Sequence, residues 1–181
     1  MASRSTIRSF LTARDSDARL AEQAALAPDA GASDLQSVWV NSAHGFQTIE
    51  GFGGAFTEAA AVTWLKLSAA QRHEVLHRYF DDTGGHGYSL CRVHMGSCDF
   101  ALGNYAHVEM PHDTALESFS IARDRQALLP FIKAAQAVAS RPLKLLASPW
   151  SPPAWMKSNG QMNPGGTLRP ECRRAWARCF V

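Results

Sequence analysis

The order of its hydrophobic patterns constrains this chain more than any other feature. From residue 46 onward, strand-like runs alternate with helix-like runs. Strands are predicted at 46–50, 88–93 and 143–148, and helices at 58–65, 68–79, 124–140 and 171–181. Alternation of this kind indicates parallel strands joined by right-handed crossovers. The predicted fold class is therefore α/β, with about three βα units.

The connecting segments differ in length according to what they follow. Those after helices are short, at 81–87 and 141–142, whereas those after strands are long, at 94–123 and 149–169. In parallel α/β folds the ligand site lies at the carboxyl ends of the strands. The long loops are therefore the predicted functional face.

Local signals mark several element ends. Thr57 is a predicted N-cap, and Ser68 with Gln71 forms the pattern of a capping box. Gly84 and Gly85 are expected to end the second helix, and Pro170 suits a first helical position. In the N-terminal segment we expect strands at 7–12 and 37–40, and a short helix or loop at 18–27.

Arg92 stands one residue before the end of an otherwise apolar predicted strand. Its side chain is therefore expected to point into the site or the interior of a barrel. A buried guanidinium requires a carboxylate partner. A purely structural ion pair is the alternative interpretation.

Asp99 lies in the loop that follows the same strand, in the run GSCDF at 96–100. A short carboxylate there could accept paired hydrogen bonds from neighbouring sugar hydroxyls. It could equally cap a turn, as loop aspartates commonly do. The pattern leaves both interpretations open.

The loop after the third strand carries two tryptophans on a proline-rich backbone, Trp150 and Trp155, followed by Asn159. Indole faces stack on the C–H faces of sugar rings, and the indole N–H can donate to a hydroxyl. Trp150 is a candidate sugar-binding residue, with Trp155 and Asn159 as further candidates on the same face. One of the two tryptophans is expected to pack in the core.

Two other motifs do not predict a ligand site. The run GFGG at 51–54 lacks the third glycine of a dinucleotide-binding loop, so a glycine-rich bend between strand and helix is the better interpretation. Cys91, His94 and Cys98 have no second ligand pair at zinc-site spacing, and we predict neither a metal nor a cofactor.

Composition excludes further classes. The formal net charge is +2 and basic residues do not run together, which disfavours a nucleic-acid partner or a membrane-surface role. No apolar run approaches the roughly 18 residues of a membrane span. The first residues show no signal-peptide core, so a cytoplasmic location is favoured if residue 1 is the true start.

Four collinear motifs resemble one enzyme family. They are QTIEGFGGAFTEAA at 47–60, GYSLCRV at 87–93, GSCDF at 96–100 and LASPWSPPAWMK at 146–157. In this order and spacing they resemble glycoside hydrolase family 30, in its glucosylceramidase-type branch. The similarity extends from about residue 37 to residue 181 and, more loosely, over residues 1–36.

That resemblance implies a retaining β-glycosidase built on a (β/α)8 TIM barrel with a side β-domain. Residues 1–45 would contribute to the side domain, and residues 46–181 would form the first three βα units. By the same resemblance, Asp99 and Trp150 would contact the hydroxyls of a bound glucose, and Arg92 would lie beneath them near the nucleophile. The implied substrates are β-glucosides, including glucosylceramide.

The 181 residues are too few for a whole barrel, which takes about 250. In the family the acid/base glutamate follows an asparagine after the fourth strand, and the nucleophile ends the seventh; the dipeptide Asn-Glu occurs nowhere in this chain. Both catalytic glutamates are thus expected beyond residue 181. The chain alone is predicted to be an inactive, poorly folded part of the enzyme, with the rest of the barrel as its partner. The alternatives are a non-catalytic sugar-binding half-barrel that assembles with another chain and, less favoured, a nucleotide-binding domain.

Overall fold

The computed structural model describes residues 6–27 and 36–181. The chain divides into two compact units, Met1–Gln47 and Thr48–Val181. The division falls close to the predicted domain boundary after residue 45. Each unit is described by itself.

The described residues of the first unit include a short antiparallel pair, β1 (Phe10–Leu11) with β2 (Ala21–Glu22). β1 lies inside the strand predicted at 7–12. β2 corrects the short helix or loop predicted at 18–27, because its residues pair with β1. Whether this pair belongs to a side domain stays a prediction.

The strand predicted at 37–40 is not formed. Val38, Trp39 and Val40 are 89%, 94% and 87% exposed, and no described residue pairs with them in a sheet. A β-branched and aromatic run becomes a strand only where a neighbouring strand receives its hydrogen bonds.

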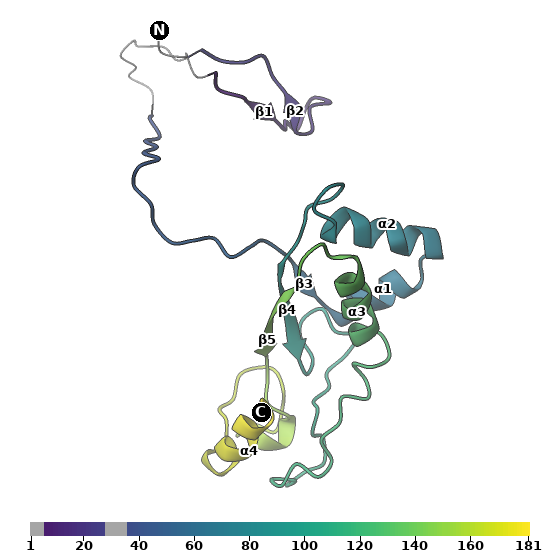
Figure 1. Ribbon diagram of the computed structural model, residues 1–181. Helices are drawn as coiled ribbons and strands as arrows, with labels where there is room; N and C mark the ends of the chain where they lie inside the picture. Colours follow the sequence, from purple (N-terminus) through teal and green to yellow (C-terminus); the bar gives the residue numbers. More distant parts are fainter. Residues whose placement is uncertain (1–5, 28–35) are drawn as a thin grey trace. The chain divides into compact units, whose positions relative to one another are not determined.

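The second unit holds a three-stranded parallel sheet with helices (Figure 1). The sheet order is β3-β4-β5. In chain order the elements are β3 (Ala55–Phe56), α1 (Glu58–Leu65), α2 (Ala69–Phe80), β4 (Leu90–Met95), α3 (Leu128–Val138), β5 (Lys144–Pro149), η1 (Ala154–Met156), η2 (Pro170–Cys172) and α4 (Arg173–Arg178). The strand–helix alternation and the parallel sheet agree with the predicted part of a barrel.

The main core lies where α1, α2 and α3 pack beside the sheet (Figure 1). Phe56 of β3 stacks on Phe80 of α2, with ring centroids 5.6 Å apart, and meets Phe131 of α3 edge-on at 5.3 Å. Cys91 and Val93 of β4 also pack in this cluster. Because strand side chains alternate, Arg92 and His94 lie on the other face of β4.

A second, smaller cluster supports the long loops. Its buried members are Val108, Met156, Cys172, Ala175 and Cys179. They come from the loop after β4, from η1 and from the C-terminal helices. This cluster holds the two long loops against each other.

The predicted N-caps of α1 and α2 are confirmed, whereas α2 ends at Phe80, four residues before the Gly84 that was expected to end it. The Thr57 hydroxyl accepts a hydrogen bond from the Ala60 N–H, and Ser68 and Gln71 form a complete capping box. The helix predicted at 124–140 is shorter, since α3 begins at Leu128. Asp124 is held by two side chains instead, Tyr105 and His107.

The strand predicted at 46–50 is wrong in position. The chain pairs with β4 further along: Ser89 N–H donates to the Phe52 carbonyl at 2.9 Å, and Arg92 N–H donates to the Gly54 carbonyl at 3.1 Å. Between them, a Cβ added at Gly53 would lie 1.9 Å from the Leu90 carbonyl oxygen. The glycine run is thus an extended segment in close contact with β4, rather than a bend.

Candidate functional site

Arg92 lies in the middle of β4, and its side chain is held by residues at the carboxyl end of β5. Its Nη2 donates to the Ser148 Oγ at 2.9 Å. Its guanidinium lies 5.0 Å from the centre of the Trp150 ring, within range of a cation–π contact. Ser148 near the end of β5 and Trp150 just after it therefore fix the side chain of Arg92.

The prediction of a buried Arg92 with a carboxylate partner is wrong for this structure. The residue is exposed, and within residues 6–27 and 36–181 it forms no ion pair. The physical reason is that the main core packs against Cys91 and Val93 on the opposite face of β4, while the Arg92 side chain stays in contact with solvent. The guanidinium is solvated there and needs no buried counter-charge.

Asp99 and Trp150 line one hollow of about 430 Å³, which we call the Asp99–Trp150 hollow. Asn104 and Asn163 also line it, and the Asn104 Nδ2 donates to the Asn163 Oδ1 at 2.7 Å. The hollow thus combines a carboxylate, two amides and an indole from both long loops. Such a set can bind hydroxyl groups beside an apolar ring face.

Asp99 does not cap a turn. Among the described residues, no N–H or O–H donates to its carboxylate, and the residue is exposed. The carboxylate is therefore free to accept hydrogen bonds from a molecule in the hollow. Its position depends on the backbone of the loop that carries it.

Trp155 and Asn159 lie outside this hollow. The Trp155 Nε1 donates to the Val108 carbonyl at 3.1 Å, and its ring packs against the second cluster. The Asn159 Nδ2 donates to the Pro164 carbonyl at 2.8 Å. Trp155 is thus the tryptophan that packs in the core, and Asn159 shapes its own loop.

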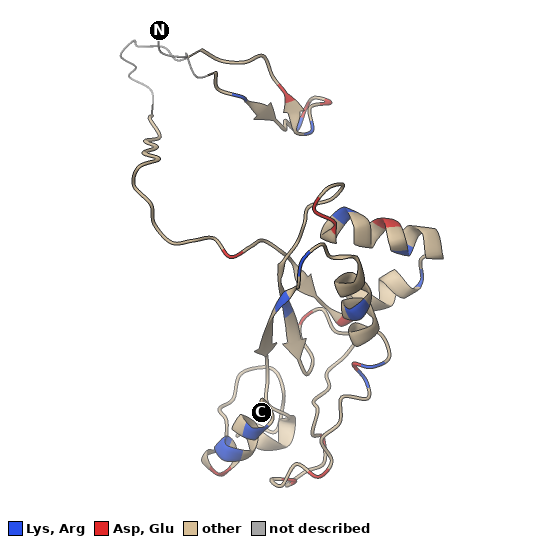
Figure 2. Ribbon diagram, in the orientation of Figure 1, with Lys and Arg blue, Asp and Glu red and all other residues tan. Residues whose placement is uncertain are grey.

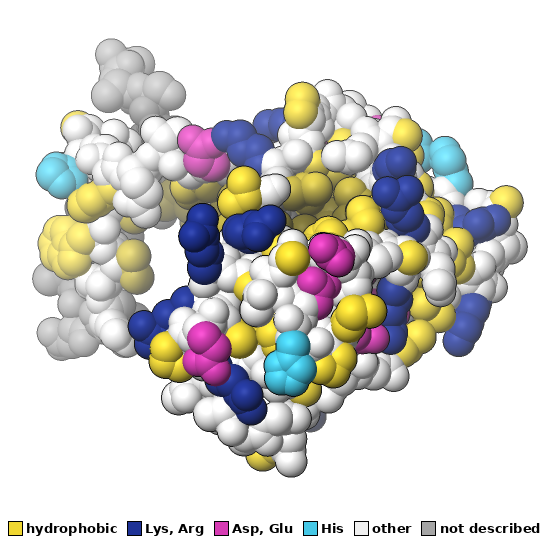
Figure 3. All heavy atoms as spheres, turned by 90° about the horizontal axis from the view of Figure 1, so that it is seen from below, with side chains coloured by type: hydrophobic (Ala, Val, Ile, Leu, Met, Phe, Trp, Pro, Cys, Tyr) yellow, Lys and Arg dark blue, Asp and Glu magenta, His cyan; other side chains and the backbone are white. Residues whose placement is uncertain are grey.

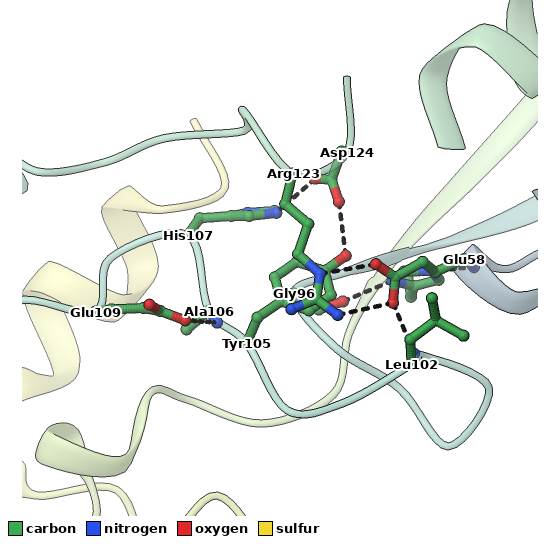
Figure 4. Close-up of polar contacts among 10 residues, drawn as sticks. Glu58, Gly96, Leu102, Tyr105, Ala106, His107, Glu109, Arg123 and Asp124 are labelled. Carbon is green, nitrogen blue, oxygen red and sulfur yellow. Dashed lines mark hydrogen bonds and ion pairs between the residues drawn. The ribbon is translucent and has the colours of Figure 1, made fainter. Parts of the chain in front are cut away.

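A group of mostly buried polar residues contacts the loop that carries Asp99, through Gly96 and Leu102; Figure 4 shows these contacts. We call it the polar cluster; its members are Glu58, His94, Tyr105, His107, Arg123 and Asp124. Glu58 is 8% exposed, and its carboxylate accepts from the Arg123 Nε at 2.7 Å and Nη2 at 3.1 Å. The Arg123 hydrogen bond holds the pKa of Glu58 below its ordinary value, against the opposing effect of burial.

His94 is a structural histidine of this cluster. Its Nδ1 lies 2.6 Å from the Gly96 carbonyl, and its Nε2 accepts from the Glu58 backbone N–H at 3.1 Å. These partners require the neutral ring with the proton on Nδ1. Neither ring nitrogen is left for a metal, although His94 stands between Cys91 and Cys98.

Asp124 joins Tyr105 to His107. The Tyr105 hydroxyl donates to Asp124 Oδ1 at 2.6 Å, and the His107 Nε2 lies 2.7 Å from Oδ2. Burial would raise the pKa of Asp124, but the hydrogen bonds from His107 and Tyr105 outweigh it and lower that pKa. Burial and the bond to Asp124 raise the pKa of Tyr105.

The sequence patterns do not predict this cluster. They place Glu58 only in a helix, and Asp124 only at the start of another. One local signal was available, because His94 shares a strand face with Arg92 and stands at the strand's carboxyl end.

Charged side chains are mixed by sign across the described elements (Figure 2). The face drawn in Figure 3 likewise shows basic and acidic side chains with apolar ones between them. Within the described residues, no helix combines the length and apolar character that spanning a bilayer requires.

Comparison with known proteins identifies one enzyme family. Residues 49–181 match the model of the glycosyl hydrolase family 30 TIM-barrel domain. The lysosomal acid glucosylceramidase of Mus musculus is 40% identical over 141 residues, which cover 75% of this chain and 27% of that enzyme. The endo-1,6-β-D-glucanase neg1 of Aspergillus fumigatus is 31% identical, over 80% of this chain and 31% of its own length.

Two solved structures are similar to this chain over most of its length. The crystal structure of SrfJ from Salmonella typhimurium has a TM-score of 0.73 and 39% identity, covering 89% of this chain and 36% of that one. The endo-β1,6-glucanase BT3312 has a TM-score of 0.70 and 27% identity, covering 91% and 36%. The chain therefore spans only about a third of the length of such relatives.

Proposed function

Because this chain belongs to glycoside hydrolase family 30, we propose that it forms the first part of a glucosylceramidase-type retaining β-glycosidase and helps to bind the glucosyl unit of a β-glucoside. The observation that carries the proposal is the Asp99–Trp150 hollow. It lies where the strands end, beside Arg92, and its residues come from both long loops.

Each side chain has a role that its chemistry supports. The free carboxylate of Asp99 would accept hydrogen bonds from two adjacent sugar hydroxyls, and charged acceptors make strong bonds. Trp150 would offer its ring face and its indole N–H to the sugar. Arg92, held by Ser148 and Trp150, would present its remaining N–H groups below the sugar.

The chemical step belongs to residues outside this set. Retaining hydrolysis uses two carboxyl groups about 5–5.5 Å apart, one as acid/base and one as nucleophile. We place both in the part of the barrel that family members have and that residues 1–181 do not match. The non-catalytic half-barrel is not proposed, because the relatives whose names state an activity are hydrolases.

A titration with D-glucose, followed by calorimetry, tests the sugar site. Asp99→Asn should weaken binding by about tenfold or more, since a hydrogen bond to a charged group contributes about 1.5–3 kcal/mol. Glu117→Gln is the matched control, because this exposed carboxylate lies in the same long loop but outside the hollow.

Equal glucose affinity in the Asp99→Asn variant and the unaltered chain would contradict the proposed site. The same preparation should not hydrolyse 4-nitrophenyl β-D-glucoside. Hydrolysis by the 181-residue chain would show that the catalytic carboxylates lie within it.

A further inference from the structure

The loop that carries Asp99, residues 96–105, is held at several points by the polar cluster and the start of α1. The Leu102 N–H donates to the Glu58 Oε2 at 2.7 Å. The Ala59 N–H donates to the Phe100 carbonyl at 3.0 Å. Both contacts lie within three residues of Asp99, on its C-terminal side.

The N-terminal side of Asp99 is held through the same helix start. The Glu58 backbone N–H donates to the His94 Nε2, and the His94 Nδ1 bonds the Gly96 carbonyl at 2.6 Å. Glu58 thus reaches the loop twice, through its side chain at Leu102 and through its backbone and His94 at Gly96. Asp99 stands between these two points.

Arg123 fixes the Glu58 carboxylate in turn. Its Nε and Nη2 reach the two carboxylate oxygens, and one of those oxygens also accepts from Leu102 (Figure 4). The Arg123 guanidinium lies 4.2 Å from the centre of the Tyr105 ring, at the end of the loop. A paired and desolvated carboxylate of this kind has one orientation, so it can hold a backbone N–H in place.

We propose that Glu58, oriented by Arg123, is a positioning residue that sets the place of the Asp99 carboxylate for sugar binding. The inference rests on the proposed function. It follows from the lack of any described hydrogen bond to Asp99 itself, since the loop backbone alone then decides where that carboxylate lies.

Two substitutions of Glu58 separate positioning from general stability. Glu58→Ala removes both the acceptor for Leu102 and the partner of Arg123. Glu58→Gln keeps one acceptor oxygen of the same reach for Leu102, but it loses the charge and replaces the oxygen that accepts from the Arg123 Nε with an amide nitrogen that cannot accept. Glu74→Gln is the matched control, because Glu74 pairs with Arg78 on the exposed face of α2.

Amide hydrogen exchange and glucose calorimetry on the full chain provide the two measurements. Glu58→Ala should speed exchange at the Leu102 amide by about tenfold or more and weaken glucose binding by a similar factor, which is the effect of losing one hydrogen bond to a charged acceptor. Exchange in α3 should not change. Glu58→Gln should restore much of both losses, and Glu74→Gln should alter neither.

The outcomes are distinguishable. Unchanged exchange at Leu102 in Glu58→Ala would overturn the inference, and so would faster exchange with full glucose affinity. If Glu58→Ala also lost protection in α3, Glu58→Gln would supply the test. Recovery of both Leu102 protection and glucose affinity in Glu58→Gln, with neither changed in Glu74→Gln, would support the inference, and no recovery would overturn it. Absence of glucose binding by the unaltered chain would contradict the proposed function, while exchange at Leu102 would still report whether Glu58 holds the loop.

Discussion

The polar residues behind the loop at 96–105 are paired with one another. Glu58 faces Arg123, and Asp124 faces His107. In the part of the chain that the structure describes, no buried side-chain nitrogen or oxygen lacks a hydrogen-bond partner. Removing Arg123 would leave the Glu58 carboxylate charged and poorly solvated, so this pair should be sensitive to substitution and to pH.

Glu58 gives the residue-scale prediction. Its pKa in the folded chain lies below the ordinary 4.5, first because Arg123 donates to it. Its ionised form therefore stabilises the fold above about pH 4.5, and this stabilisation is lost as the pH falls through the lowered pKa. In urea unfolding between about pH 5 and pH 3, Glu58→Gln should show a smaller loss of unfolding free energy than the unaltered chain.

Arg123→Met supplies the complementary test. Without the guanidinium, the opposing effect of burial remains and should raise the pKa of Glu58. The contribution of Glu58 to the pH dependence should then diminish or reverse. Parallel curves for Glu58→Gln and the unaltered chain would contradict this account.

The same residues show what sequence can indicate about the site. Trp150 is recognisable because it follows a strand directly, and Asp99 because it lies in the loop that begins where a strand ends; each belongs to an unusual local motif. Glu58 is not, because its partners Leu102 and Arg123 lie 44 and 65 residues further along the chain. Pairings over such distances depend on the tertiary fold, which no local pattern reports.

At the scale of elements, the capped starts of α1 and α2 were predictable, and the positions of the strands and of the other helix ends were less so. The caps at Thr57 and Ser68 involve residues three positions apart, so the sequence contains the whole interaction. The first strand of the sheet depends on where its backbone meets β4. That contact occurs around Gly53, several residues beyond the β-branched run from which the strand was predicted.

Two adjacent glycines give the element-scale prediction. A Cβ at Gly53 would clash with the Leu90 backbone at 1.9 Å, whereas at Gly54 it would meet only the Tyr88 Cε2, at 3.6 Å. Gly53→Ala should therefore lower the free energy of unfolding by about 2 kcal/mol or more, as forced overpacking does. Gly54→Ala should change it by less than about 0.5 kcal/mol. Equal free energies of unfolding for the two variants, measured in urea, would show that the close approach of Gly53 to β4 does not contribute to stability.

At the scale of the whole molecule, the sheet is open. Among the described residues, β5 pairs only with β4, and its outer backbone groups have no strand partner. Leu146 is 63% exposed on β5, beside Arg92 in the register of the two strands. The chain spans only about a third of the length of its relatives, so an uncovered edge and face are expected on geometric grounds.

This open edge predicts self-association. An unpaired strand with exposed apolar side chains favours pairing with a second copy, and a lysine on such a strand opposes it. In sedimentation velocity, the average mass of the unaltered chain should rise over a tenfold increase in concentration, and Leu146→Lys should reduce that rise. Met110→Lys is the matched control, because Met110 is 60% exposed but lies in a loop away from β5. If Met110→Lys were equally effective, net charge rather than the β5 edge would govern association; a mass independent of concentration would exclude association through that edge.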